Sequence, residues 1–358
     1  MNMVGIIIVG DIELSPFSKK YTKEMEAKNI PYEIIHWNRS GKENPEDNSR
    51  LTHFEQVNRF GSLISKARPF FNFRSFAKKA IKEKKYDKLI ILTTQTAVIL
   101  ADVVLSRKYK NKYFFDYRDP SYEYIRLYRM LINKIIINSY ATSVSSPGFL
   151  KYLTDKKELI MSHNFQDKFY DERLFKCSPR KEEGKVIVGC IGYLRQLEFL
   201  EKLSDIFGKD ERFEFHIYGS GDCEDELREY AKQYENVHVF GGYLEKDKME
   251  IVDSFDMICY YFLDNFVNTP GIANRFYDGV IRKKPLFGSS RIYAGELIEK
   301  KGLGISLDED DPGLTDKLFD YYENFDREQF EKNCEDYLET VMEDEKRFTD
   351  AIKEFLDS

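Results

Sequence analysis

The sequence predicts an α/β protein with two domains, each built around a parallel β-sheet. Short hydrophobic runs alternate with helical patterns along the whole chain, which is the order that parallel sheets with crossover helices require. The alternation restarts after a polar stretch at residues 177–185. The chain has 358 residues, and a single core stops growing near roughly 250–300 residues. Two domains in series are therefore expected.

Strands in the first half are expected at the hydrophobic runs, and helices at the segments between them. The expected strands cover residues 4–10, 32–37, 88–94, 112–119, 141–146 and 158–164, and the expected helices cover 17–29, 71–85, 95–109, 122–138 and 147–154. The longest apolar region, residues 89–105, is interrupted by polar residues at 93–96 and by Asp102. It therefore predicts a buried strand followed by a helix and not a membrane span.

The second half repeats the pattern and begins with a strongly hydrophobic strand. The expected strands cover residues 186–194, 213–219, 237–242, 257–262, 284–290 and 302–307, and the expected helices cover 196–207 and 222–234. Apolar residues at helical spacing over 326–357 predict one or two amphipathic helices, broken near the stretch EDEK at 343–346. A polar joint between the two sheets is expected near residues 165–184.

The composition is that of a folded protein of a reducing compartment. Hydrophobic residues make up 42% of the chain and aromatic residues 15%, which excludes wholesale disorder. The first residues, MNMVGIIIVGD, have no basic leader and too short an apolar run for a signal peptide. The five cysteines, at 177, 190, 223, 259 and 334, form no CxxC pair. They predict a reducing cytoplasm and argue against a zinc site or a disulfide framework.

Charge is distributed unevenly between the two halves. Residues 1–176 hold 31 Lys and Arg against 20 Asp and Glu, whereas residues 177–358 hold 24 against 42. Two surfaces that meet different partners would explain this segregation, and so would drift in a solvated surface.

The loops that follow strands are the first places to look for a site, because ligands of open α/β sheets bind at the carboxyl ends of strands. The stretch TPGIANRFYD (269–278) predicts a Pro-Gly turn followed by a helix start. Free backbone amides at 271–274 together with Arg275 would form an anion site, and Asp278, one turn on, could accept hydrogen bonds from hydroxyl groups of the same ligand. The alternative is an ordinary capped helix with an Arg275–Asp278 pair at (i, i+3) spacing.

Two further regions of the second half carry glycines or a cation after a strand. In CIGYLRQ (190–196) the strand ends at Gly192, where backbone can approach a ligand, and Arg195 follows at the helix entry. IYGSGDCEDEL (217–227) and VHVFGGYLEKDKM (237–249) place glycines after the next two strands, where backbone can approach a ligand closely. The alternative for Arg195 is a plain surface arginine.

With these segments the sequence resembles the GT-B glycosyltransferases, in particular the retaining family-four type of polysaccharide and capsule assembly. Gly271, the acidic position Asp278 and Pro285 fall at the spacing of that family's motif. Arg275 matches the Lys or Arg that a subset of the family carries three residues before the second acid. The family's first glutamate is replaced by Pro270.

The resemblance implies two Rossmann-like parallel-sheet domains that face each other across a cleft. Residues 1–165 would bind the acceptor and residues 166–342 the nucleotide-sugar donor, and a C-terminal helix at 343–358 would pack back on the first domain. The SHNF run (162–165) is similar to the family's exit from the first domain, and the segments from 186 to 307 follow the family's order.

The resemblance also implies roles for individual residues. Catalysis is assigned to Arg195, Arg275 and Asp119. Donor binding is assigned to residues of the second half, namely Gly192, Gly219, Gly221, Gly242, Gly271, Ile272, Asn274 and Asp278. Acceptor binding is assigned to Asp11, Asp116 and Arg118. For the DYRDP run (116–120) a capped turn before Pro120 is the alternative.

The implied activity is transfer of a sugar from a nucleotide donor onto a glycan or a lipid-linked oligosaccharide acceptor in surface polysaccharide biosynthesis. Retention of configuration follows only from the resemblance. The stretch DEDD (308–311) has the DxD spacing of metal-dependent transferases but lies in an acidic loop, and the histidines show no HxxxH or HxH spacing. Neither a metal nor another cofactor is therefore expected. The alternatives are a GT-B-like sugar-nucleotide epimerase and an inactive binding protein, which Pro270 supports best.

A membrane partner is expected through residues 59–88. This segment holds ten Lys and Arg and only two acidic residues, interleaved with phenylalanines at 60, 70, 71, 73 and 76. A cationic face with exposed aromatics would suit an anionic membrane and predicts a cytoplasmic protein peripheral on the inner face of the cell membrane. The alternative places the phenylalanines in the core. Nucleic acid is not expected, because the acidic second half would repel it.

Overall fold

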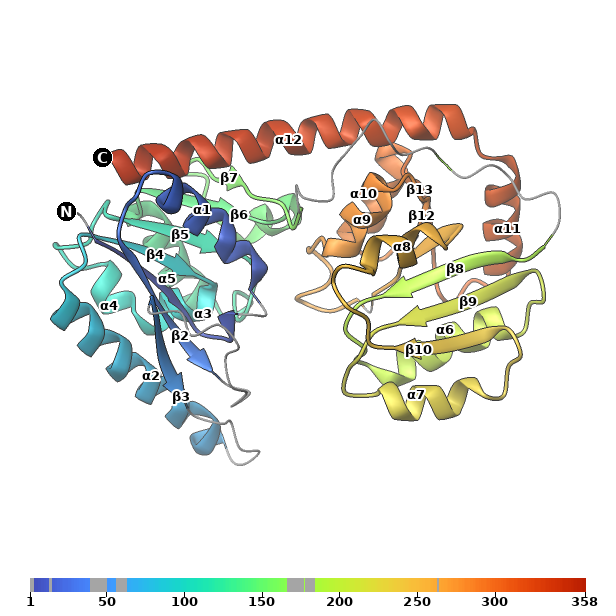
Figure 1. The fold of residues 1–358 in the computed structure, drawn as a ribbon, viewed down its shortest axis with the longest axis horizontal. Coiled ribbons are helices and arrows are strands. Elements are labelled where there is room, and N and C mark those ends of the chain that lie inside the picture. Colours follow the sequence, from blue (N-terminus) through green and yellow to red (C-terminus); the bar gives the residue numbers. More distant parts are fainter. Residues whose placement is uncertain are drawn as a thin grey trace. The chain divides into compact units, whose positions relative to one another are not determined.

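The chain folds into two compact units, each with its own β-sheet (Figure 1). The computed structural model describes residues 3–12, 15–38, 50–55, 63–165, 177, 184–262 and 264–358, except the side chains of 63–66. Unit 1 comprises Met1–His163 and Glu343–Ser358, and unit 2 comprises Asn164–Met342. Most of the joint expected at 165–184 lies outside the described residues. The α/β class with two parallel-sheet domains is confirmed.

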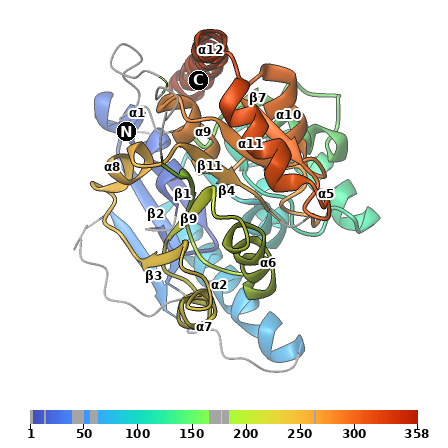
Figure 2. The ribbon, with the colours of Figure 1, turned by 90° about the vertical axis from the view of Figure 1, so that its right-hand side faces the viewer.

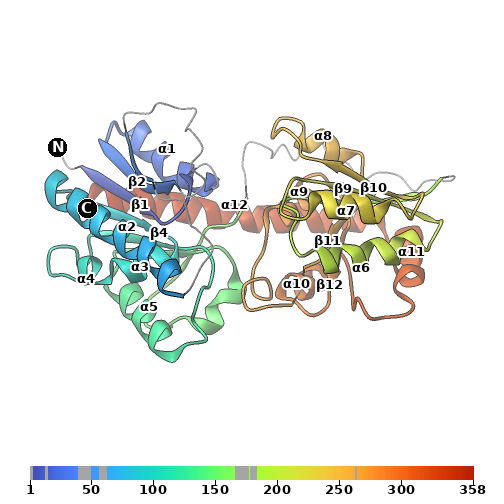
Figure 3. The ribbon, with the colours of Figure 1, turned by 90° about the horizontal axis from the view of Figure 1, so that it is seen from below.

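Unit 1 is built on a seven-stranded parallel sheet of order β3-β2-β1-β4-β5-β6-β7. Helices α2 to α5 cover one face, and α1 with the C-terminal part of α12 covers the other (Figures 1 and 3). The strands are β1 (Val4–Ile8), β2 (Tyr32–Asn38), β3 (Leu51–Glu55), β4 (Lys88–Leu92), β5 (Tyr113–Tyr117), β6 (Ala141–Val144) and β7 (Ile160–Met161). The helices are η2 (Pro16–Ser18), α1 (Lys19–Ala27), α2 (Leu63–Lys84), α3 (Thr94–Ile99), α4 (Ala101–Val104), α5 (Arg126–Asn138) and η3 (Pro147–Tyr152).

Unit 2 is built on a six-stranded parallel sheet of order β10-β9-β8-β11-β12-β13. Helices α6, α7 and α11 cover one face, and α8, α9, α10 and the start of α12 cover the other. The strands are β8 (Val186–Ile191), β9 (Phe213–Tyr218), β10 (Val237–Gly241), β11 (Met257–Tyr260), β12 (Leu286–Ser289) and β13 (Gly304–Leu307). The helices are α6 (Leu197–Gly208), α7 (Glu224–Ala231), α8 (Lys248–Asp253), α9 (Asn274–Ile281), α10 (Tyr293–Lys301), α11 (Leu314–Asn324) and α12 (Arg327–Asp357). Helices α10 and α11, both labelled in Figure 2, contact β13.

The central strands are continuous hydrophobic runs because both of their faces are covered. Every residue of β1, VGIII, is buried. Ile6 belongs to the core beneath α1 and α12, whereas its neighbour Ile7 belongs to the core beneath α2 to α5. Alternation of side chains along a strand sends consecutive residues to opposite faces, so a strand covered on both sides needs apolar residues throughout.

Several expected elements are corrected by the structure. The sequence prediction omitted β3, a half-exposed strand at the edge of the sheet. Helix α2 begins at Leu63 and includes Pro69, the expected helix at 95–109 is two short helices, and 147–152 is a 3₁₀ helix. Helix α12 is continuous through the EDEK stretch where a break was expected.

The acidic residues of the EDEK stretch are held by partners of unit 1. Lys20 Nζ lies 2.7 Å from both Glu345 Oε2 and the carbonyl of His163. The backbone amide of His163 donates to Glu345 Oε1 at 2.7 Å, and its ring nitrogen Nε2 lies 3.1 Å from Asp344 Oδ2. These contacts satisfy the carboxylates while the helix continues, which explains why the charge run does not end α12.

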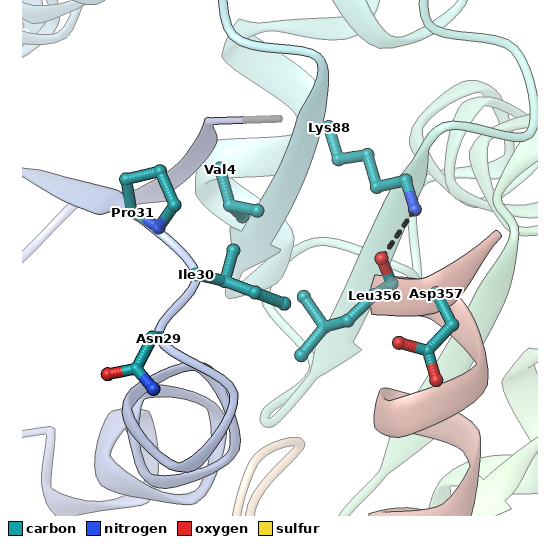
Figure 4. Close-up of a pocket in the computed structure, with 7 residues that line it drawn as sticks. All are labelled: Val4, Asn29, Ile30, Pro31, Lys88, Leu356 and Asp357. Atoms are coloured by element: carbon teal, nitrogen blue, oxygen red, sulfur yellow. Dashed lines mark hydrogen bonds between the residues drawn. The ribbon is translucent and has the colours of Figure 1, made fainter. Parts of the chain in front are cut away.

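The far end of α12 is fixed by a buried lysine. Lys88 Nζ donates to the carbonyls of Phe355 at 2.6 Å and Leu356 at 3.0 Å, in the last turn of the helix. A cation at this position pairs with carbonyls that have no partner within the helix and with the negative end of the helix dipole. Lys88 and Leu356 also border a hollow of about 310 Å³, together with Val4 and Ile30 (Figure 4). This hollow lies at the amino ends of β1 and β4, opposite the edge where ligands of such sheets bind.

The described residues of 59–88 do not present most of their phenylalanines to solvent, as the expected membrane surface would require. Residues 59–62 lie outside the described part. Phe73 is fully buried, Phe70 and Phe76 pack against the same core, and Phe71 is 67% exposed. The core alternative therefore holds for most of these phenylalanines. None of the described helices is both long enough and apolar enough to cross a membrane.

Candidate functional site

The candidate site of unit 2 lies at the carboxyl ends of β8, β9 and β11, where the start of α9 follows the turn after β11. This is the edge of an open α/β sheet at which ligands bind, and β8 and β11 are adjacent in the sheet although they are far apart in sequence. The residues assigned to donor binding come from these loops.

Two of the predicted glycines are required by the packing of the loops on each other. Gly219 has φ +152°, and a Cβ there would lie 1.7 Å from the carbonyl oxygen of Gly192. A Cβ at Gly221 would lie 1.9 Å from the carbonyl oxygen of Leu194. The expected reason was close approach to a ligand, but in both places neighbouring backbone occupies the space. Gly192 differs, since among the described residues other than its two chain neighbours no atom lies within 4 Å of a Cβ built on it.

Gly242 meets a side chain and not backbone. A Cβ at Gly242 would lie 2.3 Å from Ser220 Oγ, so the β10 loop is held close to the β9 loop. Gly192, directly after β8, therefore has open space beside its backbone. This position is the place in the three loops where a ligand could approach the main chain.

Arg275, on the first turn of α9, is held across the ends of two strands. Its Nη2 donates to the carbonyl of Tyr261 at 2.6 Å, and its Nη1 donates to Cys190 Sγ at 3.4 Å. The guanidinium lies 3.9 Å from the ring centroid of Phe262. Its Nε is buried without a hydrogen-bond partner among the described residues. Arginine carries five N–H donors, so a fixed positive charge with donors to spare is presented at the ends of β8 and β11.

The thiol of Cys190 lies beside Arg275, and its pKa is shifted. The hydrogen bond with Cys259 and the nearby Arg275 guanidinium lower the pKa of the Cys190 thiol, although burial opposes the shift. Cys259 lies on β11, adjacent to β8, and burial raises its pKa. The two thiols are free.

The helix start is more closed than the sequence predicts. The amide of Gly271 donates to the carbonyl of Asn268 at 3.1 Å, and the amide of Ala273 donates to Tyr260 Oη at 2.6 Å. Two of the four amides expected to be free are therefore used within the loop. The carbonyl of Ile272 accepts from Asn164 Nδ2 at 2.8 Å, which gives the asparagine of the SHNF run a structural role. Asn274 is the first residue of α9 and is half-buried.

Asp278 is buried and forms an ion pair with Lys248. Helical (i, i+3) spacing would instead have paired it with Arg275. Asp278 is 4% exposed, and its Oδ2 lies 2.6 Å from Lys248 Nζ of α8. Lys248 is also buried. Burial raises the pKa of Asp278, while Lys248 lowers it. No Arg275–Asp278 ion pair is formed among the described side chains, so the alternative of a surface pair does not hold, and Asp278 is not open to a ribose in this conformation.

Arg195 is exposed at the other side of the loop after β8. Its guanidinium lies 5.3 Å from the ring centroid of Tyr193, and Tyr193 Oη donates to Asp222 Oδ1 at 2.6 Å. Arg195 makes no ion pair within the part of the chain that the structure describes. Gln196, which follows it, has φ +66° and starts α6. Arg195 is therefore a free surface cation next to the open position at Gly192.

Tyr243 and Lys248 belong to this site but were not predicted. Burial, followed by the charges of Asp278 and Glu245, raises the pKa of Tyr243 to about 12. Both residues lie in the VHVFGGYLEKDKM stretch, which was singled out only for its glycines. A buried lysine within a charged sequence has no signal of its own, because its burial depends on how α8 packs on α9.

The acceptor residues predicted in unit 1 divide into buried and accessible ones. Arg118 Nε and Nη2 donate to the two carboxylate oxygens of Asp116 at 3.0 and 3.2 Å, and Nη1 donates to the carbonyl of Ser162 at 3.0 Å. Asp116 and Arg118 are buried, so this pair holds β5 to the segment after β7 and does not face an acceptor. Asp119 is exposed, and Asp11 is half-buried after β1.

The acidic loop at 308–311 is already neutralised by basic side chains. Arg291 contacts Asp308 at 2.7 Å, Glu309 at 2.9 Å and Asp310 at 2.7 Å. Lys202 also pairs with Asp310, and Lys317 pairs with Asp311. The loop therefore forms a local charge network on the surface, in which a cation would have to compete with three basic side chains.

Comparisons with known proteins were made for sequence and for structure. No protein-family model and no curated protein matches the sequence. Solved structures do match. Sucrose-phosphate synthase from Thermosynechococcus elongatus superposes with a TM-score of 0.72 at 8% identity, and each chain is covered to 100%. A trehalose-6-phosphate protein from E. coli bound with UDP-2-fluoro glucose superposes with a TM-score of 0.68 at 9% identity, over 98% of this chain and 99% of that chain.

A third similar structure is a galactosyltransferase of the lipopolysaccharide outer core. The lipopolysaccharide outer core galactosyltransferase WaaB superposes with a TM-score of 0.64 at 12% identity, over 98% of this chain and 99% of that chain. Similarity at this level of identity establishes the architecture along the whole chain. The chain has the two-domain fold of the GT-B glycosyltransferases.

Proposed function

We propose that the protein is a glycosyltransferase that binds a nucleotide-sugar donor in unit 2 and transfers the sugar to a glycan or a lipid-linked oligosaccharide. The observation that carries the proposal is Arg275, a half-buried guanidinium fixed at the carboxyl ends of β8 and β11, whose Nη1 and Nη2 each donate one hydrogen bond there. The fold adds support, since one solved structure of the same fold holds UDP-2-fluoro glucose and another holds UDP.

The diphosphate of the donor would lie between Arg275 and Arg195, next to the open backbone at Gly192. Transfer breaks the bond between the sugar C1 and the phosphate oxygen and forms the bond from C1 to the acceptor hydroxyl oxygen. Negative charge develops on the departing diphosphate, and two arginines stabilise it there. In a retaining reaction the departing phosphate oxygen takes the acceptor proton, so no side-chain base is needed.

The acceptor is assigned to unit 1. Asp119 is the exposed carboxylate of the turn after β5, and Asp11 follows β1. Both lie at the carboxyl edge of the unit 1 sheet, the edge at which ligands of open sheets bind. We place them in contact with sugar hydroxyls, and the buried Asp116–Arg118 pair beneath Asp119 fixes the turn. Surface polysaccharide biosynthesis is the process that such an acceptor fits.

The proposal is tested by measuring release of UDP, GDP or TDP from the corresponding nucleotide sugars. A transferase releases the diphosphate faster when a glycan or lipid-linked acceptor is added, and the product carries one more sugar. A GT-B-like epimerase would change the sugar nucleotide without an acceptor. A binding protein would bind the nucleotide and release nothing, and that result would remove the transferase assignment.

Turnover is expected to survive removal of divalent cations. The positive charge that stabilises the diphosphate comes from Arg195 and Arg275, and the carboxylates of the 308–311 loop are held by Arg291, Lys202 and Lys317. The measurement is the initial rate of diphosphate release after treatment with EDTA. A rate that falls to background and returns with Mn²⁺ would contradict metal-independent transfer.

We also place a membrane contact on unit 1, but on α5 and the turn before it rather than on α2. The exposed apolar side chains of this α5 face are Tyr122, Tyr124, Ile125, Leu127 and Met130, of which Leu127 is 76% exposed. Between residues 120 and 154 the sequence has four Lys and Arg, and Glu123 is its acidic residue. Glu123 is fully buried, so the face shows positive charge together with apolar side chains.

This combination favours an anionic bilayer over a second protein. Arg126, Arg129 and Lys134 are exposed and make no ion pair among the described residues, whereas Arg74 and Lys78 of α2 pair with Asp102. Each unpaired cation near an anionic lipid surface contributes about 1 kcal/mol. Exposed apolar side chains add insertion into the headgroup region.

The α5 face is expected to bind vesicles of phosphatidylglycerol and phosphatidylcholine, and binding should fade as salt rises, because exposed charges are screened within about 8 Å at physiological ionic strength. The double variant Leu127→Glu/Met130→Glu should lose co-sedimentation. Phe71→Glu, which charges an equally exposed apolar residue on α2, is the matched control and should bind like the unmodified protein. Loss of binding in the control alone would return the contact to residues 59–88.

A further inference from the structure

Two histidines and a glutamate gather on the edge of the unit 2 sheet, away from the residues assigned to the donor. Glu214 and His216 are two residues apart on β9, and His238 on β10 is paired in register with His216. Phe213, Phe215 and Ile217 point into the core beneath α6 and α7. The alternate residues of β9 therefore point to the opposite face of the sheet, where they are half-buried.

The donor atoms of the three side chains converge on one point. His216 Nε2 lies 3.0 Å from Glu214 Oε2, and His238 Nε2 lies 3.5 Å from the same oxygen. All three candidate ligand atoms lie within 4.8 Å of one another. The two imidazole rings are near-perpendicular, with centroids 5.2 Å apart. Both rings thus direct Nε2 towards one carboxylate oxygen.

These separations match the edges of a metal coordination tetrahedron. Zinc binds histidine nitrogen at about 2.0–2.1 Å and carboxylate oxygen at about 2.0–2.2 Å, and tetrahedral geometry then places donor atoms about 3.3–3.5 Å apart. The two measured separations lie at or close to that range. Two imidazoles and a carboxylate are also a donor set that suits zinc.

We propose that Glu214, His216 and His238 form a zinc site, with the fourth position open to water or to a ligand from solution. Lys185 Nζ lies 3.8 Å from Glu214 Oε1, which leaves Oε2 to the metal as a single carboxylate ligand. The ion would join β10, the edge strand, to β9 and would secure an edge that is otherwise held by its ladder and by α7. The site is independent of the proposed transferase activity.

This proposal departs from the expectation of no metal, which rests on histidine spacing. His216 and His238 belong to different strands, so no HxH or HxxxH motif connects them. Only the parallel register of β9 and β10 brings them together. The acidic loop at 308–311 is the contrasting case, because its carboxylates already contact Arg291.

The test uses the full chain, freed of metal with EDTA and dialysed. Titration with ZnCl₂ in a calorimeter should show one saturable site, and Co²⁺ should give the visible absorption of a tetrahedral complex. His216→Gln and His238→Gln should each weaken zinc binding by at least about tenfold. His53→Gln is the matched control, because it disrupts the other close histidine pair, in which His36 Nε2 lies 2.7 Å from His53 Nδ1.

Each outcome decides the assignment. The site is supported if His53→Gln keeps its zinc affinity while His216→Gln and His238→Gln both lose it. Absence of saturable binding, or binding that His53→Gln removes and the site variants retain, overturns it. Circular dichroism of the variants shows whether they are folded, and a melting temperature that zinc raises in the unmodified chain but not in His238→Gln provides a second readout.

Discussion

Replacing Arg275 by alanine is expected to weaken binding of a nucleoside diphosphate by about 1.5–3 kcal/mol, which is roughly 10- to 150-fold. The reason is that the guanidinium is fixed by Tyr261, Cys190 and the ring of Phe262 and still has unused N–H groups. A prearranged cation loses little entropy when it binds a phosphate. Isothermal calorimetry with the best-binding diphosphate of UDP, GDP and TDP is the measurement.

Arg212→Ala is the matched control for this prediction. Arg212 belongs to the same unit but precedes β9, at the amino edge of the sheet, where it pairs with Asp210 at 2.6 Å and Asp316 at 2.7 Å. Its loss removes one positive charge from unit 2 without touching the candidate site. Equal weakening in both variants would indicate a general electrostatic effect, and unchanged affinity in Arg275→Ala would remove the arginine from the donor site.

Replacing Lys248 by methionine is expected to destabilise unit 2 by about 3–5 kcal/mol, since it leaves Asp278 with its charge buried and unpaired. The pair lies 2.6 Å apart, with 7% and 6% of the two side chains exposed. Methionine keeps much of the volume, so packing changes little. Urea unfolding followed by far-UV circular dichroism measures the loss, and the double variant Lys248→Met/Asp278→Asn should recover most of it.

The double variant also separates two roles of Asp278. If Asp278 is purely structural, the recovered protein binds nucleoside diphosphate as tightly as the unmodified chain. If Asp278 leaves Lys248 to contact ribose when the donor binds, the recovered protein loses affinity for the nucleoside diphosphate but not for pyrophosphate. A single variant Lys248→Met that unfolds at the same urea concentration as the unmodified chain would contradict the buried-pair account.

Most of the fold could be predicted because strands covered on both faces have a strong hydrophobic signal. Strands such as β1, β4 and β8 are runs of buried apolar residues, and their positions follow from sequence. β3 was missed because it lies at the edge of its sheet and is half-exposed, so its pattern LTHFE is weak. The prediction of a break in α12 was wrong because the partners of Asp344 and Glu345 are distant in sequence and could not be foreseen from it.

Residues of the candidate site could be predicted only where their position in the sequence is informative without knowledge of the packing. Arg275 could be found because its position at a helix start has meaning in the sequence. Lys248 could not be found, because its burial depends on the packing of α8 against α9. Gly219 and Gly221 are needed where they stand because neighbouring backbone passes close to them, which the sequence does not show. Asp116 and Arg118 read as accessible turn residues but pair beneath the surface.

The central claim is that a nucleoside diphosphate binds at the carboxyl ends of β8 and β11 beside Arg275. Hydrogen exchange of the full chain with and without the diphosphate tests it most directly, because backbone amides report where the ligand lies. We expect slower exchange in residues 192–196 and 271–276, and no such protection in Arg275→Ala at the same nucleotide concentration. Protection confined to unit 1, or equal in the two proteins, would contradict the claim.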